Sequence, residues 1–187
     1  MSRVVFLLEE YSMKVLLEEL LPRLFPTLPF LCVAHEGKQD LERSVRKKLA
    51  AWREPGARFV VVRDNDNGDC RALKQRLVGL CTARADTIVR IACQEVEAWY
   101  LGDPIALAEA FNESQLAEVG RQARFRDPDA VPGPAKALEE LVPGFQKVSG
   151  ARRLAPHLDP ARNRSASFRA FIDAVRRLAP PVSQEVV

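Results

Sequence analysis

Four short apolar runs, separated by stretches with helical periodicity, dominate the first half of the chain. Residues 4–8, 30–34, 59–62 and 87–93 are rich in strand-forming residues, as in strands that are buried on both faces. Between them, apolar residues recur every three or four positions, which is the pattern of helices that bury one face. Strands that alternate with amphipathic helices form parallel βαβ units. The sequence therefore predicts an α/β fold with a mostly parallel sheet of about four strands and flanking helices.

Cap and turn residues set the expected limits of these helices. Ser12 is in position to cap the first helix, and Pro26 and Pro29 end it. The second and third helices are expected from about residue 40 to 52 and from about 70 to 84. A Pro-Gly pair breaks the second of them before the next strand begins.

After residue 95 the character of the sequence changes. Helical patterns and Pro/Gly breaks continue, but no further strand is predicted, and Ser165 is in position to cap a last helix that ends near residue 178. We therefore expect an α/β core over residues 1–101 and a helical part over 102–179 that packs on it. Residues 180–187 are expected to be a frayed tail.

Composition and cysteine spacing indicate an ordinary globular protein. The chain has 187 residues, of which 47% are hydrophobic and 28% charged. No apolar run approaches the ~20 residues of a membrane span, and the N-terminal run meets Glu9 and Glu10 at once, unlike a signal peptide. The four cysteines include no C-x-x-C pair. We expect a cytoplasmic protein with reduced, structural thiols and no membrane contact.

Acidic residues follow several of the predicted strands, where an open parallel sheet binds its ligands. Carboxylates gathered at one edge repel one another unless a cation lies between them, and hard oxygen ligands suit Mg²⁺ or Mn²⁺. The sequence therefore predicts a metal site at the carboxyl edge of the sheet. Its candidate ligands are Glu9, Asp64, Asp66, Glu95 and Glu97.

Some of these residues also have a structural interpretation. Asp and Asn after a strand are common in turns and helix caps, so Asp66 to Cys70 could simply begin the next helix. Glu95 and Glu97 point ~200° apart if both are helical, so only one is expected to serve the site. His35 could transfer a proton in the site, or it could make ordinary hydrogen bonds within the turn that contains it.

The other marked feature is a basic segment from residue 147 to 177, with eight basic and two acidic residues. The whole chain carries only +3, so the remainder is slightly acidic. A basic lobe beside an acidic metal site would suit a phosphodiester, although a solvated helical face explains the same charges. The predicted nucleic-acid contacts are Lys147, Arg152, Arg153, Arg162 and Arg164.

These residues carry a family resemblance. A strand followed by Glu9, then a serine-containing turn, then a strand ending in Asp64-x-Asp66, resembles the TOPRIM domain of topoisomerases, primases and overcoming-lysogenization-defect nucleases. The chain is also similar, over roughly residues 4 to 178, to a bacterial family known as domain of unknown function 4276, which is regarded as TOPRIM-like. The segments that carry this similarity are LEEYS at 8–12, HEGKQDL at 35–41, RDND at 63–66, QEVEAWYL at 94–101 and GFQKVSGAR at 144–152.

The TOPRIM resemblance implies roles for individual residues. Glu9 matches the glutamate that acts as general acid/base or metal ligand, Asp64 and Asp66 match metal-binding aspartates, and Lys147 would stabilise charge on a phosphoryl group. Two positions depart from the pattern, since Glu10 replaces a glycine and Met13 replaces an acidic residue of nuclease-type members. The side chains expected to support these groups are Glu10, Ser12, His35 and Asp69.

Three functional hypotheses follow from this resemblance and from the residues. The first is a Mg²⁺-dependent phosphodiester-cleaving enzyme, a nuclease or nuclease subunit acting on nucleic acid. The second is a non-catalytic subunit that docks on an ATPase of the recombination or SMC-like type, which the resemblance makes a plausible partner. The third is a small phosphatase with Asp64 as nucleophile and Asp66 as acid/base, although in such enzymes the Asp-x-Asp pair usually follows the first strand.

Overall fold

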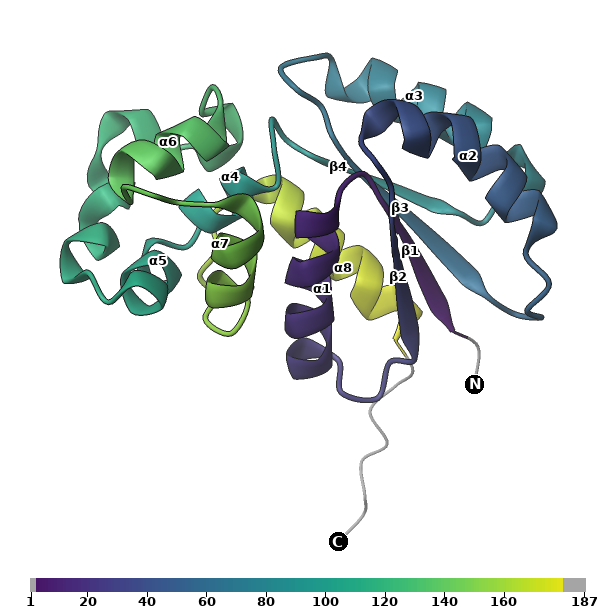
Figure 1. Cartoon of the computed structure of the whole chain (residues 1–187), viewed down its shortest axis with the longest axis horizontal. Helices are drawn as coiled ribbons and strands as arrows, with labels where there is room; N and C mark the ends of the chain where they lie inside the picture. The colour runs from purple at the N-terminus through teal and green to yellow at the C-terminus, as the bar shows by residue number, and fades with distance from the viewer. Residues whose placement is uncertain (1–2, 180–187) are drawn as a thin grey trace, which may run out of the picture.

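The computed structural model describes residues 3–179 and confirms the α/β fold (Figure 1). Its four strands are all parallel and lie in the order β2-β1-β3-β4. The strands are β1 (Val4–Leu8), β2 (Phe30–Ala34), β3 (Arg58–Asp64) and β4 (Ile88–Ala92). The helices are α1 (Tyr11–Leu24), α2 (Lys38–Ala51), α3 (Cys70–Leu80), α4 (Glu97–Leu101), α5 (Pro104–Phe111), α6 (Pro134–Leu141), α7 (Lys147–Leu154) and α8 (Ala166–Leu178). Short 3-10 turns cover Thr82–Arg84, Ser114–Arg121, Ala123–Phe125 and Pro128–Ala130.

The sheet is buried on both faces because successive side chains of its central strands enter two different cores. Phe6 and Leu8 of β1 belong to one apolar cluster with α1, whereas Val5 and Leu7 belong to another with α2 and α3. Every residue of β1 is fully buried. This explains the unbroken apolar run, since strands covered on both faces have no position for a solvated side chain.

The C-terminal helices extend the first of these cores. Helices α4 to α7 form a lobe beside the carboxyl edge of the sheet, and α8 returns along the face that α1 covers (Figure 1). The ring centroid of Phe171 in α8 lies 6.1 Å from that of Phe6 and 5.1 Å from that of Trp99. Because α8 completes the layer over the sheet, the predicted core of residues 1–101 shares its hydrophobic cluster with the last helix. The boundary at residue 101 stays a prediction.

Several local predictions are confirmed and others are wrong. Ser165 caps α8, accepting a hydrogen bond from the backbone N–H of Phe168, as expected. The prediction that Ser12 caps α1 is wrong, because the helix begins at Tyr11 and Ser12 donates instead to the carboxylate of Glu10. The third helix stops at Leu80 and a separate 3-10 turn follows it. The tail predicted to fray, 180–187, lies outside the described residues.

The model also bears on the membrane prediction. Among residues 3–179, no helix is both long enough and apolar enough to cross a membrane.

Candidate functional site

The site forms where β1 and β3 lie side by side at the carboxyl edge of the sheet. The chain places β2 on one side of β1 and β3 on the other, so this is the point at which the strand order reverses and where open α/β sheets bind ligands. Glu9 follows β1, and its Oε2 accepts a hydrogen bond from the backbone N–H of Asp64 at 3.0 Å. Both carboxylates are buried. The Glu9 carboxylate therefore contacts the backbone of Asp64 at the end of β3.

A third carboxylate and a lysine reach the same place from the helical lobe. Glu97 is the first residue of α4 and is fully buried, and Lys147 is the first residue of α7. The Lys147 Nζ lies 3.4 Å from Glu10 Oε1 and 3.6 Å from Glu97 Oε2. The ammonium group therefore sits between acidic side chains that follow β1 and β4. Sequence segments 137 residues apart meet at this ion pair.

Burial and mutual repulsion keep these carboxylates in an unusual electrostatic state. Burial, with the charges of Glu97 and Glu9, holds the pKa of Asp64 well above its usual range. Burial raises the pKa of Glu97 to about 7, against the opposing charge of Lys147. Burial also raises the pKa of Glu9, opposed by its hydrogen bond from Asp64. Although burial alone would lower it, the pKa of Lys147 is raised because Glu97 and Glu10 favour the charged ammonium.

Several buried oxygens of the site have no hydrogen-bond partner in the described part of the chain. They are Oδ1 of Asp64, both carboxylate oxygens of Glu97 and the hydroxyl of Tyr100. Buried polar atoms are normally satisfied by the protein, by ordered water or by an ion, so these oxygens are available to a further partner. Carboxylate oxygens suit Mg²⁺ and Mn²⁺, so the donor set fits a hard divalent cation. Within residues 3–179, however, no group of three His, Cys, Asp or Glu side chains is arranged so that all three could bind one ion.

Of the two candidate glutamates after β4, the structure directs Glu97 toward the other carboxylates. The Oε2 of Glu95 instead accepts a hydrogen bond from the backbone N–H of Ala135 at 2.8 Å, at the start of α6. Asp66 has a left-handed backbone conformation (φ 48°), and its carboxylate pairs with Lys38 at 3.0 Å. The roles predicted for Glu95 and Asp66 as ligands stay predictions, and neither side chain has a direct contact with Asp64 or Glu97.

The expected supporting residues divide into two groups. Glu10 and Ser12 belong to the site through Lys147 and their own hydrogen bond. His35 is buried and makes two hydrogen bonds, from Nδ1 to the Leu8 carbonyl (2.8 Å) and from Lys48 Nζ to its Nε2 (2.7 Å). These bonds correspond to the ordinary alternative for His35, since they orient the turn after β2.

The basic segment is used largely inside the helical lobe. Arg153 donates to the Ala110 carbonyl and stacks over Phe111, Arg162 pairs with the buried Asp103 at 2.7 Å, and the Arg164 guanidinium donates to the carbonyls of Gly120 and Phe125. Arg152 is exposed, and Lys147 alone of the five lies among the acidic residues. Nucleic-acid binding by the four arginines stays a prediction, which these internal contacts do not favour.

Two comparisons with known proteins bear on this geometry. The model of the family called Domain of unknown function (DUF4276) matches residues 8–176 of the chain. The chain belongs to this family. Among curated proteins none matches.

Solved structures show the same fold as this DUF4276 member. The C-terminal region of the Burkholderia pseudomallei OLD protein is 17% identical, with a TM-score of 0.60 over 96% of this chain and 100% of that one. The C-terminal region of the Xanthomonas campestris pv. campestris OLD protein is 16% identical, with a TM-score of 0.58 over 95% and 96%. At these identities the likeness concerns the fold.

A basic hollow that sequence reasoning missed adjoins the acidic residues. The cavity, of about 400 Å³, is lined by Lys38, Arg63 and Arg76 together with the acidic Asp66 and Asp69. Lys38 pairs with Asp66, and both arginines pair with Glu42. Arg63 is itself buried and connects this hollow to the site, since its Nε lies 3.7 Å from Glu9 Oε2. Lys38 is the last residue of the motif HEGK and Arg63 is the first of RDND, so the charge within those motifs could have identified them. Sequence reasoning also missed Tyr100, whose hydroxyl lies near Glu97 and Asp64, because it belongs to the largely apolar run AWYL.

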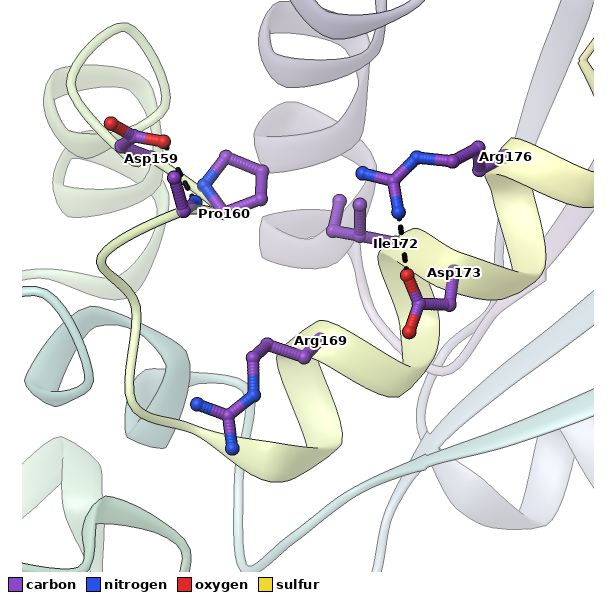
Figure 2. Close-up of a pocket in the computed structure, with 7 residues that line it drawn as sticks. Asp159, Pro160, Arg169, Ile172, Asp173 and Arg176 are labelled. Carbon is purple, nitrogen blue, oxygen red and sulfur yellow. Dashed lines mark hydrogen bonds and ion pairs between the residues drawn. The ribbon is translucent and has the colours of Figure 1, made fainter.

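Another hollow lies away from these residues, on α8. Figure 2 shows its lining, in which Arg176 pairs with Asp173 at 2.6 Å and Arg169 lies one turn earlier. The Arg169 guanidinium donates to the Asn163 carbonyl. Both arginines of this hollow are therefore already bound by other residues of the DUF4276 member, and we do not assign the hollow to the site.

Asp69 provides a test that separates a helix cap from a support of the site. Its Oδ1 accepts hydrogen bonds from the backbone N–H groups of Arg71 and Ala72, which caps α3. We expect Asp69→Ala to lower the free energy of unfolding by about 1 kcal/mol, the usual cost of a lost cap, without changing Mn²⁺ affinity. Chemical denaturation and calorimetry measure the two effects. A weakened Mn²⁺ affinity in this variant would restore Asp69 to the site.

Proposed function

We propose that this DUF4276 member is a Mg²⁺- or Mn²⁺-dependent enzyme that cleaves phosphodiester bonds of nucleic acid, acting as a nuclease or nuclease subunit. One observation carries the proposal: Asp64 and Glu97 have buried carboxylate oxygens with no hydrogen-bond partner, and both lie near Glu9 at the switch point of a parallel sheet. Carboxylates in such a place are costly unless a cation joins them. The acidic edge is thus best explained as a binding site for a hard cation.

The proposed roles follow from the contacts of each side chain. Asp64 and Glu97 would hold the ion, with Glu9 as a further ligand or as the general acid/base, since burial raises its pKa toward the range that such a group needs. A bound divalent ion would polarise a phosphoryl oxygen and help to generate hydroxide. Lys147, which now neutralises Glu10 and Glu97, would turn toward the substrate phosphate and stabilise its charge.

The basic hollow supports a nucleic-acid substrate. Three cationic side chains, Lys38, Arg63 and Arg76, line this cavity with Asp66 and Asp69. These cations would exchange their present pairs with Asp66 and Glu42 for the phosphates of the substrate. A phosphodiester backbone needs cations of this kind beside the ion-binding carboxylates. The fold likeness to OLD proteins agrees with the sequence resemblance to overcoming-lysogenization-defect nucleases. We assign the first phosphate contacts to this hollow and to Lys147, ahead of Arg152, Arg153, Arg162 and Arg164.

The proposal is tested with plasmid DNA and with single-stranded DNA and RNA. Cleavage is expected with Mn²⁺ or Mg²⁺, is expected to disappear with EDTA, and is expected to fall at least about 100-fold in Glu9→Gln, by analogy with the loss of a charge-stabilising group. Glu36→Gln is the matched control, since Glu36 lies in the exposed turn after β2 and is expected to leave cleavage unchanged. Cleavage that persists in EDTA, or in Glu9→Gln, would contradict the proposal.

A second candidate function has its own supporting observation. Lys147 already neutralises part of the acidic edge, and Tyr11, directly after Glu10, is 55% exposed. Such an edge would also suit a non-catalytic subunit that docks on a recombination or SMC-like ATPase in the cytoplasm. Co-purification with such an ATPase, without cleavage by the complex in Mn²⁺, would favour this candidate over the first.

A further inference from the structure

Two cysteines from distant parts of the sequence lie against each other beside the site. Cys70 is the first residue of α3, Cys93 directly follows β4, and their Sγ atoms are 3.6 Å apart. Both side chains are half-buried and line a cavity of about 210 Å³. By contrast, Cys32 and Cys81 are each only 3% exposed and belong to the two apolar cores.

We propose that Cys70 and Cys93 are a reversible oxidation site, which forms a disulfide on exposure to a peroxide or to a small-molecule disulfide. A disulfide requires the two sulfurs to approach to about 2 Å, with Cβ atoms about 3.8 Å apart. The two Sγ atoms, 3.6 Å apart, need to approach by about 1.6 Å to form the bond. The cavity supplies the access that a small oxidant needs, and it distinguishes this pair from the two core cysteines.

The surroundings assign a role to each thiol. Cys70 lies at the N-terminus of an 11-residue helix, and Arg71, Lys74 and Arg90 line the same cavity. Positive charge of this kind favours a thiolate. Cys70 is therefore the attacking sulfur and Cys93 the resolving one.

The proposed chemistry balances with hydrogen peroxide as the oxidant. The Cys70 thiolate attacks one peroxide oxygen, the O–O bond breaks, and hydroxide leaves, giving a sulfenic acid on Cys70. The Cys93 sulfur then attacks the Cys70 sulfur, the S–O bond breaks, and water forms with the proton from Cys93. The hydroxide takes up the proton that Cys70 released on ionising, so two thiols are oxidised to one disulfide and one peroxide is reduced to two waters. A thiol reductant reverses the reaction.

The disulfide would join two loops that the structure already connects. The backbone N–H of Asp66 donates to the Gln94 carbonyl at 3.0 Å, and that of Asn65 donates to the Ala92 carbonyl at 3.3 Å. Asp66 and Gln94 both have left-handed backbone conformations. One loop carries Asp66 and the other leads to Glu97, so oxidation would fix the spacing of two segments at the carboxyl edge. This site does not depend on the proposed nuclease activity.

The test is peptide mapping of the purified full chain after treatment with hydrogen peroxide or oxidised glutathione. We expect a linked peptide pair containing Cys70 and Cys93, a mass loss of about two hydrogens, and complete reversal by dithiothreitol. Because the bond spans 23 residues, the melting temperature of the oxidised form is expected to rise by roughly 5 °C. Cys70→Ser and Cys93→Ser should each lose the shift, and Cys81→Ser, the matched control, should keep it.

Two results would overturn the inference. One is that Cys70 and Cys93 stay reduced under conditions in which a reference dithiol is fully oxidised. The other is that they end as separate glutathione adducts or as links to other cysteines. The peptide map of the unaltered chain decides between these results, so the conclusion holds even where a serine variant fails to fold.

Discussion

Replacing Asp64 with asparagine is expected to weaken Mn²⁺ binding by at least about 100-fold and, at the same time, to stabilise the fold. The first effect follows from the loss of a charged ligand. Mutating a residue that only hydrogen-bonds to a ligand typically lowers metal affinity 10–100-fold, and losing the ligand itself costs more. The second follows from the electrostatics of the metal-free protein. Burial and the neighbouring Glu97 and Glu9 disfavour the ionised form of Asp64, and a neutral amide avoids that penalty while donating to the same carboxylates.

The pH dependence identifies the cause of this stabilisation. Since the pKa of Asp64 is raised in the folded state, stability is lost as pH rises from the ordinary aspartate value toward the raised one. The gain from Asp64→Asn should therefore be absent near pH 3.5 and should grow as pH rises toward the raised pKa of Asp64. Urea denaturation at several pH values measures it.

Asp86→Asn provides the matched control, because Asp86 is exposed and follows the 3-10 turn before β4. It should change neither Mn²⁺ affinity nor stability by more than about 0.5 kcal/mol. If Asp64→Asn lowered stability at pH 8, or kept the Mn²⁺ affinity of the unaltered chain, Asp64 would be a structural residue and the proposed metal site would be wrong.

The sheet and the first half of the site could be predicted because both follow from local sequence. An apolar run that is buried on both faces has one interpretation, and parallel pairing then brings the residues after β1 and β3 to one edge. The contact of Glu9 with Asp64 follows from this register alone. The distance between these two residues is set by the backbone of the paired strands, and the sequence predicts that pairing.

The rest depends on contacts that periodicity does not encode. Glu95 and Glu97 are equivalent by spacing, and only the packing of α6 directs Glu95 to Ala135. Arg162 and Arg164 match a phosphate-binding pattern, but the lobe uses them to satisfy its own carboxylate and carbonyls. Scattered cysteines give no spacing signal, so the contact of Cys70 with Cys93 emerges only after α3 is docked on β4.

Replacing Lys147 with methionine is expected to destabilise the protein by about 1–3 kcal/mol at pH 8.5. Removing one partner of a buried ion pair costs about 3–5 kcal/mol, and the smaller figure allows for solvent screening, since the Lys147 side chain is 36% exposed. Glu97 would be left as an unpaired buried carboxylate. Lys14→Met, which removes an exposed pair with Glu18 on α1, should cost under about 0.5 kcal/mol.

The pH profile and a second substitution show whether Glu97 is the cause. The pKa of Glu97 in the folded protein is about 7. In the unaltered chain, ionisation of Glu97 therefore lowers the free energy of unfolding between about pH 4.5 and pH 7 and changes it little above that. Without Lys147 its pKa rises further, so the cost of Lys147→Met should be larger at pH 8.5 than at pH 6. Adding Glu97→Gln removes the titrating group and should abolish this difference. A cost that is equal at both pH values, or that survives Glu97→Gln, would mean that Lys147 acts through packing of α7 and not by neutralising the carboxylates on which the proposed metal site depends.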